Sequence, residues 1–212
     1  MELKIATWNI RGANTLDKQN EVRNLIQTEK LSICAVLETH LKTKTVKDIS
    51  NYIFGNWDWI SNVKYSSNSC RMIIGWDPNK VRVMVIHMNK QATFCKVETV
   101  NAKSSFFCTF VYASNNGIER RRLWADLENH KSISANKPWV ILGDFNVILK
   151  VDEHSAGGSS MTEDMNEFQE CVNKVEIEDI CKTGFQFTWT KSLQNPNCDI
   201  LKKLDRVMAN EE

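Results

Sequence analysis

Short apolar runs separated by polar turns fill most of the 212-residue chain, and most of them have the period of β-strands. A first strand is expected over residues 3–9, where apolar and polar positions alternate. LSICAVLE (31–38) is continuously apolar, which suits a strand buried on both faces. From about residue 58 to 112 five runs follow one another across turn clusters, which predicts antiparallel meanders. These runs are WDWISN, SCRMIIGW, KVRVMVIHM, ATFCKVETV and SSFFCTFVYA.

Four segments have helical spacing instead. They are DKQNEVRNLIQTE, a short segment around residues 46–53, IERRRLWADLENH with the stripe Leu123, Trp124 and Leu127, and a segment with Met165, Phe168, Val172 and Val175 on one face. Ser160 and Glu163 have the spacing of a capping box for the last helix. WVIL (139–142), FQFTW and KKLDRVM complete the strands. Because helices come singly among many strands, we expect an α/β fold of two sheets covered by helices.

The composition is that of an ordinary globular domain, with 42% hydrophobic residues, 25% charged residues and a net charge of +1. No apolar run approaches the ~20 residues of a membrane helix, and the start has no signal-peptide pattern, so an intracellular protein that is not membrane-bound is expected. The seven cysteines show no CxxC pair, which favours reduced thiols over a zinc site or disulfides. No GxxxxGK, HExxH or GxSxG motif is present.

The predicted strands share one feature, which is that each ends in a polar or ionisable residue. These strand ends are Asn9, Glu38, Tyr112 with Ser114, Asp144 with Asn146, Thr188 with Trp189, and Asp205 with Arg206. An Asn or Asp after a strand is usually a turn former, so a single one carries little weight. If the ends share one rim, they form a cleft with carboxylates and neutral donors. Oxygen ligands of this kind suit a hard cation such as Mg²⁺, with Mn²⁺ as the alternative. Such an ion supports attack of water on a phosphoryl group.

The motifs TWNIRG, LETHL, FVYAS, GDFN, FTW and LDRV, in this order, resemble those of the endonuclease/exonuclease/phosphatase family, and the resemblance covers essentially the whole chain. It implies a four-layer αββα sandwich with two mixed, largely antiparallel sheets over one domain, residues 1–212. VYASNNGIERRRLW, GDFNVILKVDEHSAGGS, GFQFTW and KKLDRVMAN look most like the endonuclease domain of plant LINE-type non-LTR retrotransposons. That likeness implies a nuclear enzyme that nicks DNA to prime reverse transcription, acting as a monomer, with a reverse transcriptase downstream in the parent element.

The resemblance also implies roles for individual residues. Glu38 is the expected metal ligand, with Asn9 beside it. Asp144 orients or activates the water, and Asn146 and Tyr112 contact the scissile phosphate. Asp205 matches the aspartate that orients a catalytic histidine. Thr188, Arg206 and Arg71 are expected to contact nucleic acid.

One part of the family's pattern is missing, because no Ser-Asp-His element follows LDRV. We therefore expect the last strand or strands to be truncated, the domain to be incomplete at its C-terminus and the chain to be impaired. His154 is the one candidate substitute. Two alternatives to a DNA endonuclease stay open, a phosphatase of the same fold acting on a small molecule or lipid and a non-enzymatic retroelement remnant. The basic run Arg120–Arg122 is either a solvated helix face or a phosphate contact.

Overall fold

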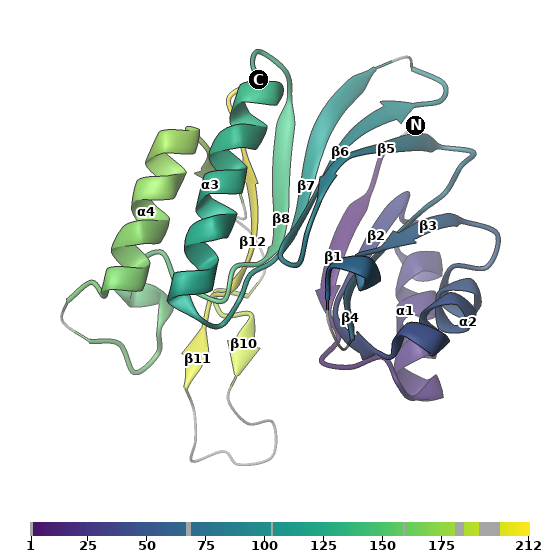
Figure 1. The fold of residues 1–212 in the computed structure, drawn as a ribbon, viewed down its shortest axis with the longest axis horizontal. Coiled ribbons are helices and arrows are strands. Elements are labelled where there is room, and N and C mark those ends of the chain that lie inside the picture. Colours follow the sequence, from purple (N-terminus) through teal and green to yellow (C-terminus); the bar gives the residue numbers. More distant parts are fainter. Residues whose placement is uncertain (1, 67–68, 103, 159, 181–184, 191–199) are drawn as a thin grey trace. The chain divides into compact units, whose positions relative to one another are not determined.

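The structure is a computed structural model that describes residues 2–212 except 67–68, 103, 159, 181–184 and 191–199. The chain divides into two compact units, Met1–Tyr112 and Ala113–Glu212 (Figure 1). A single catalytic domain over residues 1–212 therefore stays a prediction. Among the described residues, no helix has the length and apolar character that crossing a membrane requires.

The first unit contains a four-stranded sheet and a three-stranded meander (Figure 1). In the sheet, β1 (Ile5–Asn9) pairs in parallel with β2 (Ile33–Leu41), and the antiparallel strands β4 (Cys70–Trp76) and β3 (Asp58–Ser61) follow. The meander consists of β5 (Val81–Met88), β6 (Ala92–Thr99) and β7 (Ser105–Tyr112). The predicted succession of antiparallel strands is confirmed, and a 3₁₀ helix, η1 (Val63–Tyr65), precedes β4.

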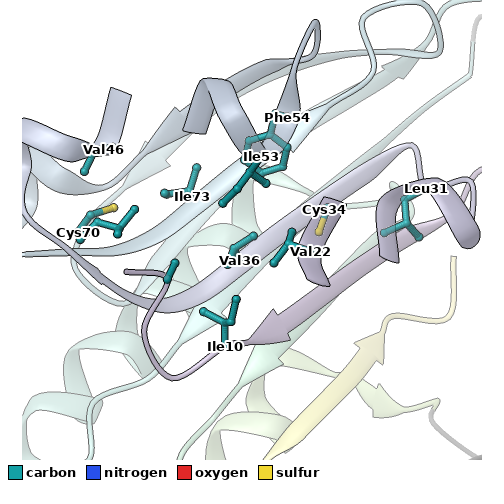
Figure 2. Packing of buried hydrophobic residues seen from close by; sticks show 12 residues of the cluster. Ile10, Val22, Leu31, Cys34, Val36, Val46, Ile53, Phe54, Cys70 and Ile73 are labelled. Atoms are coloured by element: carbon teal, nitrogen blue, oxygen red, sulfur yellow. The ribbon is translucent and has the colours of Figure 1, made fainter. Parts of the chain in front are cut away.

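Two helices, α1 (Leu16–Thr28) and α2 (Thr43–Phe54), pack on the four-stranded sheet. Figure 2 shows Val22 of α1 and Ile53 of α2 meeting Cys34 and Val36 of β2. Residues 33–37 of β2 are all buried, as expected for a strand covered on both faces. This packing holds the C-terminal half of β2, which carries Glu38, against a rigid core.

The second unit contains two helices and a short sheet. Helices α3 (Gly117–Ile133) and α4 (Glu163–Val175) contact each other through Trp124 and Phe168, whose stacked rings lie 5.0 Å apart. The sheet order is β8 (Trp139–Asp144), β12 (Asp205–Ala209) and β9 (Glu178–Asp179), all antiparallel. A separate ribbon joins β10 (Trp189–Thr190) to β11 (Leu201–Lys202), and η2 (Val151–Glu153) is a 3₁₀ helix.

Two local predictions for this unit are wrong. Thr162, not Ser160, caps α4, because its hydroxyl accepts from the backbone N–H of Met165 at 3.3 Å. KKLDRVM is not one strand, since β11 ends at Lys202 and β12 begins at Asp205. The predicted buried stripe of α3 is confirmed, because Leu123, Trp124 and Leu127 are all buried.

Five cysteines lie in the described residues, and all five are free and buried: Cys34, Cys70, Cys95, Cys108 and Cys171. Burial raises the thiol pKa of Cys34 and of Cys95 to about 12. Since the thiolate is the reactive form, these thiols are inert near neutral pH. Cys181 and Cys198 lie outside the described residues.

We therefore expect a Cys181→Ser/Cys198→Ser variant to show almost no reaction with a thiol-directed dye at pH 7.5 while it is folded. In denaturant the same variant should react at five thiols per chain. The time course of dye release measures both states. Rapid labelling of the folded variant would show that at least one of the five thiols is exposed, contrary to the structure.

Candidate active site

Asn9 and Glu38 are brought together by the parallel pairing of β1 and β2. In the register of these strands Asn9 lies opposite Leu37, the residue before Glu38. The side-chain oxygen of Asn9 accepts from the backbone N–H of Arg11 at 3.1 Å. The N–H of Gly12 donates to the carbonyl of Glu38 at 2.7 Å. The chain leaving β1 is thus bonded to the chain leaving β2, and both predicted metal-site residues lie at one end of neighbouring strands.

The end of β2 has an unusual backbone. Glu38 and His40 both have positive φ, 54° and 52°, and the pairing of β2 with β4 shifts register between Leu37 and Leu41. Left-handed backbone in residues other than glycine costs of order 1–3 kcal/mol each and persists only where the surroundings enforce it. Thr39 contributes to this enforcement, because its buried hydroxyl donates to the carbonyl of Cys70 at 2.8 Å. Irregular strand ends of this kind often direct side chains into functional sites.

His40 and Arg71 extend from Glu38 as a chain of polar contacts. The Oε1 atom of Glu38 lies 3.2 Å from Nε2 of His40. Nη1 of Arg71 lies 3.2 Å from Nδ1 of the same ring. Arg71 was expected to contact nucleic acid, and the structure places its guanidinium against His40. No role was predicted for His40 from the sequence, although its position two residues after Glu38 was a usable signal.

Tyr112 is the last residue of β7 and is half-buried. Its backbone N–H donates to the carbonyl of Gln91 at 2.8 Å, which fixes the strand end to the turn before β6. Its contact with a scissile phosphate stays a prediction.

Asp144 and Asn146 form a tight turn at the end of β8. Asp144 is 2% exposed, and its Oδ1 accepts from the backbone N–H of Asn146 at 2.9 Å. Asn146 has a φ of 51°, a conformation that asparagine tolerates better than most residues. Its side-chain amide donates to the carbonyl of Ala113 at 2.8 Å, and the N–H of Ala113 donates back to the carbonyl of Asp144 at 2.8 Å. The two-residue spacing of acid and amide therefore builds a closed hydrogen-bonded loop that orients both side chains.

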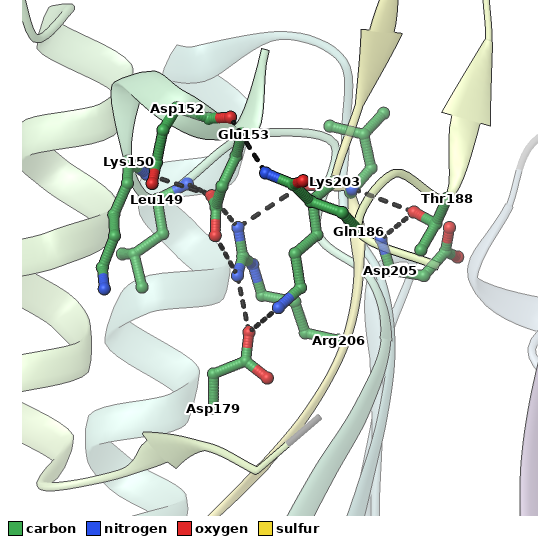
Figure 3. Close-up of polar contacts among 11 residues, drawn as sticks. Leu149, Lys150, Asp152, Glu153, Asp179, Gln186, Thr188, Lys203, Asp205 and Arg206 are labelled. Atoms are coloured by element: carbon green, nitrogen blue, oxygen red, sulfur yellow. Dashed lines mark hydrogen bonds and ion pairs between the residues drawn. The ribbon is translucent and has the colours of Figure 1, made fainter. Parts of the chain in front are cut away.

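Asp205 lies directly opposite Asp144 in the pairing of β12 with β8. Side chains at opposite positions point to the same face, and two ionised carboxylates placed there repel each other. The Thr188 hydroxyl supports this position, since it accepts from the backbone N–H groups of Leu204 at 3.1 Å and Asp205 at 3.0 Å (Figure 3). The second unit thus gathers four predicted site residues, and its paired acids suit a positively charged or proton-donating ligand.

Arg206 does not have its predicted role, because its side chain is 0% exposed. It points away from the Asp205 face, as alternation along a strand requires. Its guanidinium donates to both carboxylate oxygens of Glu153 and, at 2.7 Å, to Asp179 (Figure 3). Lys203 adds an ion pair to Asp179 at 2.8 Å. The predicted contact of Arg206 with nucleic acid is therefore wrong, and Arg206 ties η2 and β9 to β12.

The basic run on α3 is also divided by burial. Arg120 is 2% exposed, and its Nη1 donates to the carbonyl of Ser114 at 2.8 Å and, at 3.4 Å, to that of Asn146. Its Nη2 pairs with Asp164 of α4 at 2.6 Å. Arg121, by contrast, is exposed and pairs with Glu163 and Glu167. Arg120 thus holds the turn of Asn146, a role that was not predicted from the sequence. Its spacing from Leu123, Trp124 and Leu127 was the available signal, because it falls on their stripe.

A metal would rest on few protein ligands. Among the described residues, no group of three or more histidine, cysteine or acidic side chains is placed to hold an ion. The oxygen donors at strand ends are Glu38 with Asn9 in the first unit and Asp144 with Asp205 in the second. One or two carboxylates plus retained waters is the coordination that Mg²⁺ prefers. The residues present therefore fit a weakly held hard cation. That the two groups share one rim stays a prediction.

His154, the candidate substitute for the missing catalytic histidine, is held by hydrogen bonds within its own loop. The Nδ1 atom of His154 accepts from the backbone N–H of Ala156 at 3.2 Å, and His154 forms a bridge with Lys202 of β11. The structure therefore gives His154 a local structural role, and a catalytic role for it stays a prediction.

Comparison with solved structures shows the fold. The endonuclease domain of TRAS1, a telomere-specific non-LTR retrotransposon, matches with a TM-score of 0.74 at 8% identity, covering 99% of this chain and 86% of that one. The catalytic domain of Xenopus laevis APE2 matches with a TM-score of 0.72 at 13% identity, covering 99% and 82%. A mannosyl-6-phosphatase from Bacteroides thetaiotaomicron VPI-5482 matches with a TM-score of 0.62 at 13% identity, covering 100% and 86%. The predicted α/β sandwich with two mixed sheets is confirmed.

The sequence itself shows the family. The profile of the Endonuclease/Exonuclease/phosphatase family matches residues 6–212, nearly the whole chain. The match spans every predicted site residue from Asn9 to Arg206. Family and fold together indicate a hydrolase of the phosphodiesterase kind. The chain belongs to the Endonuclease/Exonuclease/phosphatase family.

Proposed function

We propose that this chain is a Mg²⁺-dependent DNA endonuclease of retroelement origin, which nicks DNA to expose a primer for reverse transcription. The observation that carries the proposal is the placement of buried Asp144 opposite Asp205, with Asn146 and Thr188 bonded around them. The likeness to the TRAS1 endonuclease domain and to the APE2 catalytic domain supports a nucleic-acid substrate.

The proposal assigns the following roles to the site residues. Glu38, with Asn9 beside it, holds the cation, which supplies Lewis-acid polarisation of the phosphoryl oxygen when it is bound. Asp144 accepts the proton of the attacking water, since its carboxylate is already oriented by Asn146. The amide of Asn146 and the hydroxyl of Tyr112 donate to the non-bridging phosphate oxygens, where negative charge grows. Asp205 would orient the histidine of a Ser-Asp-His element, which the family's pattern has and these 212 residues do not contain.

The proposal extends to the biological setting. DNA is the partner, with Thr188 and Arg71 among the contacts. The chain acts in the nucleus as a monomer, and a reverse transcriptase domain follows it in the parent element. Mn²⁺ is expected to support activity in place of Mg²⁺. The 212 residues contain no Ser-Asp-His element, so we expect slow nicking by this chain that becomes faster when such a segment is supplied.

The experiment compares two substrate classes. We expect conversion of supercoiled plasmid to the nicked circle with Mg²⁺ or Mn²⁺, suppression by EDTA, and a steep fall of DNA affinity with salt because phosphate contacts dominate. Release of inorganic phosphate from sugar phosphates and from phosphoinositides should stay at background. Phosphate release without nicking would replace the proposal with the phosphatase alternative. Inactivity toward both classes, even with the Ser-Asp-His segment added, would favour the non-enzymatic remnant.

A further inference from the structure

We infer that His40, held by Arg71, is a positioning residue that orients the Glu38 carboxylate for a divalent cation. The inference rests on the proposed function, because it assigns a second layer to the same site. It starts from three side chains that meet where β2 ends and β4 begins: Glu38, His40 and Arg71.

The tautomer of His40 follows from the chemistry of its neighbours. The carboxylate of Glu38 accepts hydrogen bonds, so Nε2 of His40, 3.2 Å from Oε1, carries a proton and is the donor. Nη1 of Arg71 lies 3.2 Å from Nδ1 and 3.5 Å from Nε2 of the same ring. Because these two distances are nearly equal, the guanidinium packs against the ring and holds it beside Glu38.

The backbone beneath the three side chains is held firmly. The buried side chain of Asn62 accepts from the N–H groups of Arg71 at 3.1 Å and Met72 at 2.9 Å. Its amide donates to the carbonyls of Asn89 at 3.2 Å and Lys90 at 3.1 Å. Arg71 is thereby fixed to the turn between β5 and β6. On the other strand, the bulge gives Glu38 and His40 the positive φ values that bring residues two apart into contact.

The consequence concerns how Glu38 can bind an ion. With Oε1 engaged by His40, the carboxylate presents Oε2 to a cation, which favours a single metal–oxygen contact over a bidentate one. Mg²⁺ bound through one or two carboxylate contacts keeps most of its waters. Partners that orient a metal ligand through a hydrogen bond typically contribute a factor of about 10–100 in metal affinity. The His40 side chain is 40% exposed, so its replacement is compatible with folding.

The first test measures metal affinity with the full chain, through the electron paramagnetic resonance signal of free Mn²⁺ and competition by Mg²⁺. We expect His40→Ala to weaken Mn²⁺ binding by roughly tenfold. His40→Gln should recover most of the affinity, because its amide N–H can donate to Glu38. His87→Ala, a histidine of β5 in the same unit, is the matched control and should bind as the parent does.

The outcomes separate the inference from the proposed function. If Glu38→Gln abolishes Mn²⁺ binding while His40→Ala binds like the parent, the positioning role is overturned and the proposed metal site stands. If Glu38→Gln binds as tightly as the parent, the proposed metal site itself fails, and the inference fails with it. A second readout needs no metal, since ¹⁵N shifts of the His40 ring report its tautomer directly. A ring whose only proton is on Nδ1 would overturn the inference.

Discussion

Replacing Asp144 with asparagine is expected to lower the rate of DNA nicking by roughly 10²–10⁴-fold, the range typical of a lost general base. The substitution removes the charge but keeps a side-chain oxygen at Oδ1, so the bond accepted from the N–H of Asn146 can persist. The turn, and with it the orientation of Asn146 by Ala113, should therefore survive. Single-turnover nicking of plasmid measures the rate, and thermal unfolding monitored by circular dichroism verifies the fold.

The matched control for this variant is Asp152→Asn, a change at an exposed acid of η2 in the same unit. It should nick at the parental rate. If Asp144→Asn is folded and also nicks at the parental rate, Asp144 does not activate the water. If nicking is too slow to quantify in the parent, the comparison is made on the chain supplied with a Ser-Asp-His segment.

The second large effect concerns stability. Arg206→Met is expected to lower the free energy of unfolding by about 3–5 kcal/mol, because it leaves the buried carboxylate of Glu153 without its positive partner. Glu153 is 8% exposed and loses both of its bonds to the guanidinium, while Asp179 keeps Lys203. Urea denaturation of the two proteins gives the difference. Arg121→Met, which removes the exposed ion pairs to Glu163 and Glu167, is the control and should change stability little.

The same network predicts a pH dependence. Burial raises the pKa of the Glu153 carboxyl, but the hydrogen bond and charge of Arg206, with the N–H groups of Leu149 and Lys150, outweigh burial and leave the pKa below its usual 4.5. A carboxyl whose pKa is lowered by folding stabilises the folded state at pH values above the pKa it has in the unfolded chain. This stabilisation is lost as the pH falls through the pKa of the folded state. Acid should therefore destabilise the parent more steeply below pH 4.5 than Glu153→Gln. If the free energy of unfolding falls equally steeply with pH in the parent and in Glu153→Gln, the lowered pKa of Glu153 is contradicted.

Local sequence patterns predicted the elements that depend on neighbours along the chain. The apolar run of β2, the meander of β5 to β7 and the stripe of α3 all appear where periodicity placed them. The start of α4 was misplaced because Ser160 and Thr162 both offer a capping hydroxyl, and the capping-box spacing favoured the wrong one. The structure selects Thr162, whose cap lets Met165 and Phe168 enter the core.

In the site too, features set by neighbouring residues were predictable and features set by distant residues were not. The hydrogen bond between Asp144 and Asn146 joins residues two apart, so the sequence was sufficient for it, whereas the bond from Asn146 to Ala113 spans 33 residues. The burial of Arg206 could not be read locally, because its partners Glu153 and Asp179 lie 53 and 27 residues away along the chain. Arg120 likewise depends on Asp164 of another helix. A strand-end arginine and a basic helical run look solvent-exposed until distant acids are brought to them by folding.

The approach of α4 to the first residue of α3 limits how this protein can be recombined with its relatives. A side chain at Gly117 would overlap the carboxylate of Asp164, the same carboxylate that pairs with Arg120. A chimera that takes α3 from a homologue with a larger residue at this position, but keeps α4, would force Asp164 away from Arg120. The N-terminal ends of α3 and α4 therefore have to be taken from the same parent protein. Crossover points for library construction belong outside residues 117–164, so that both partners come from the same parent.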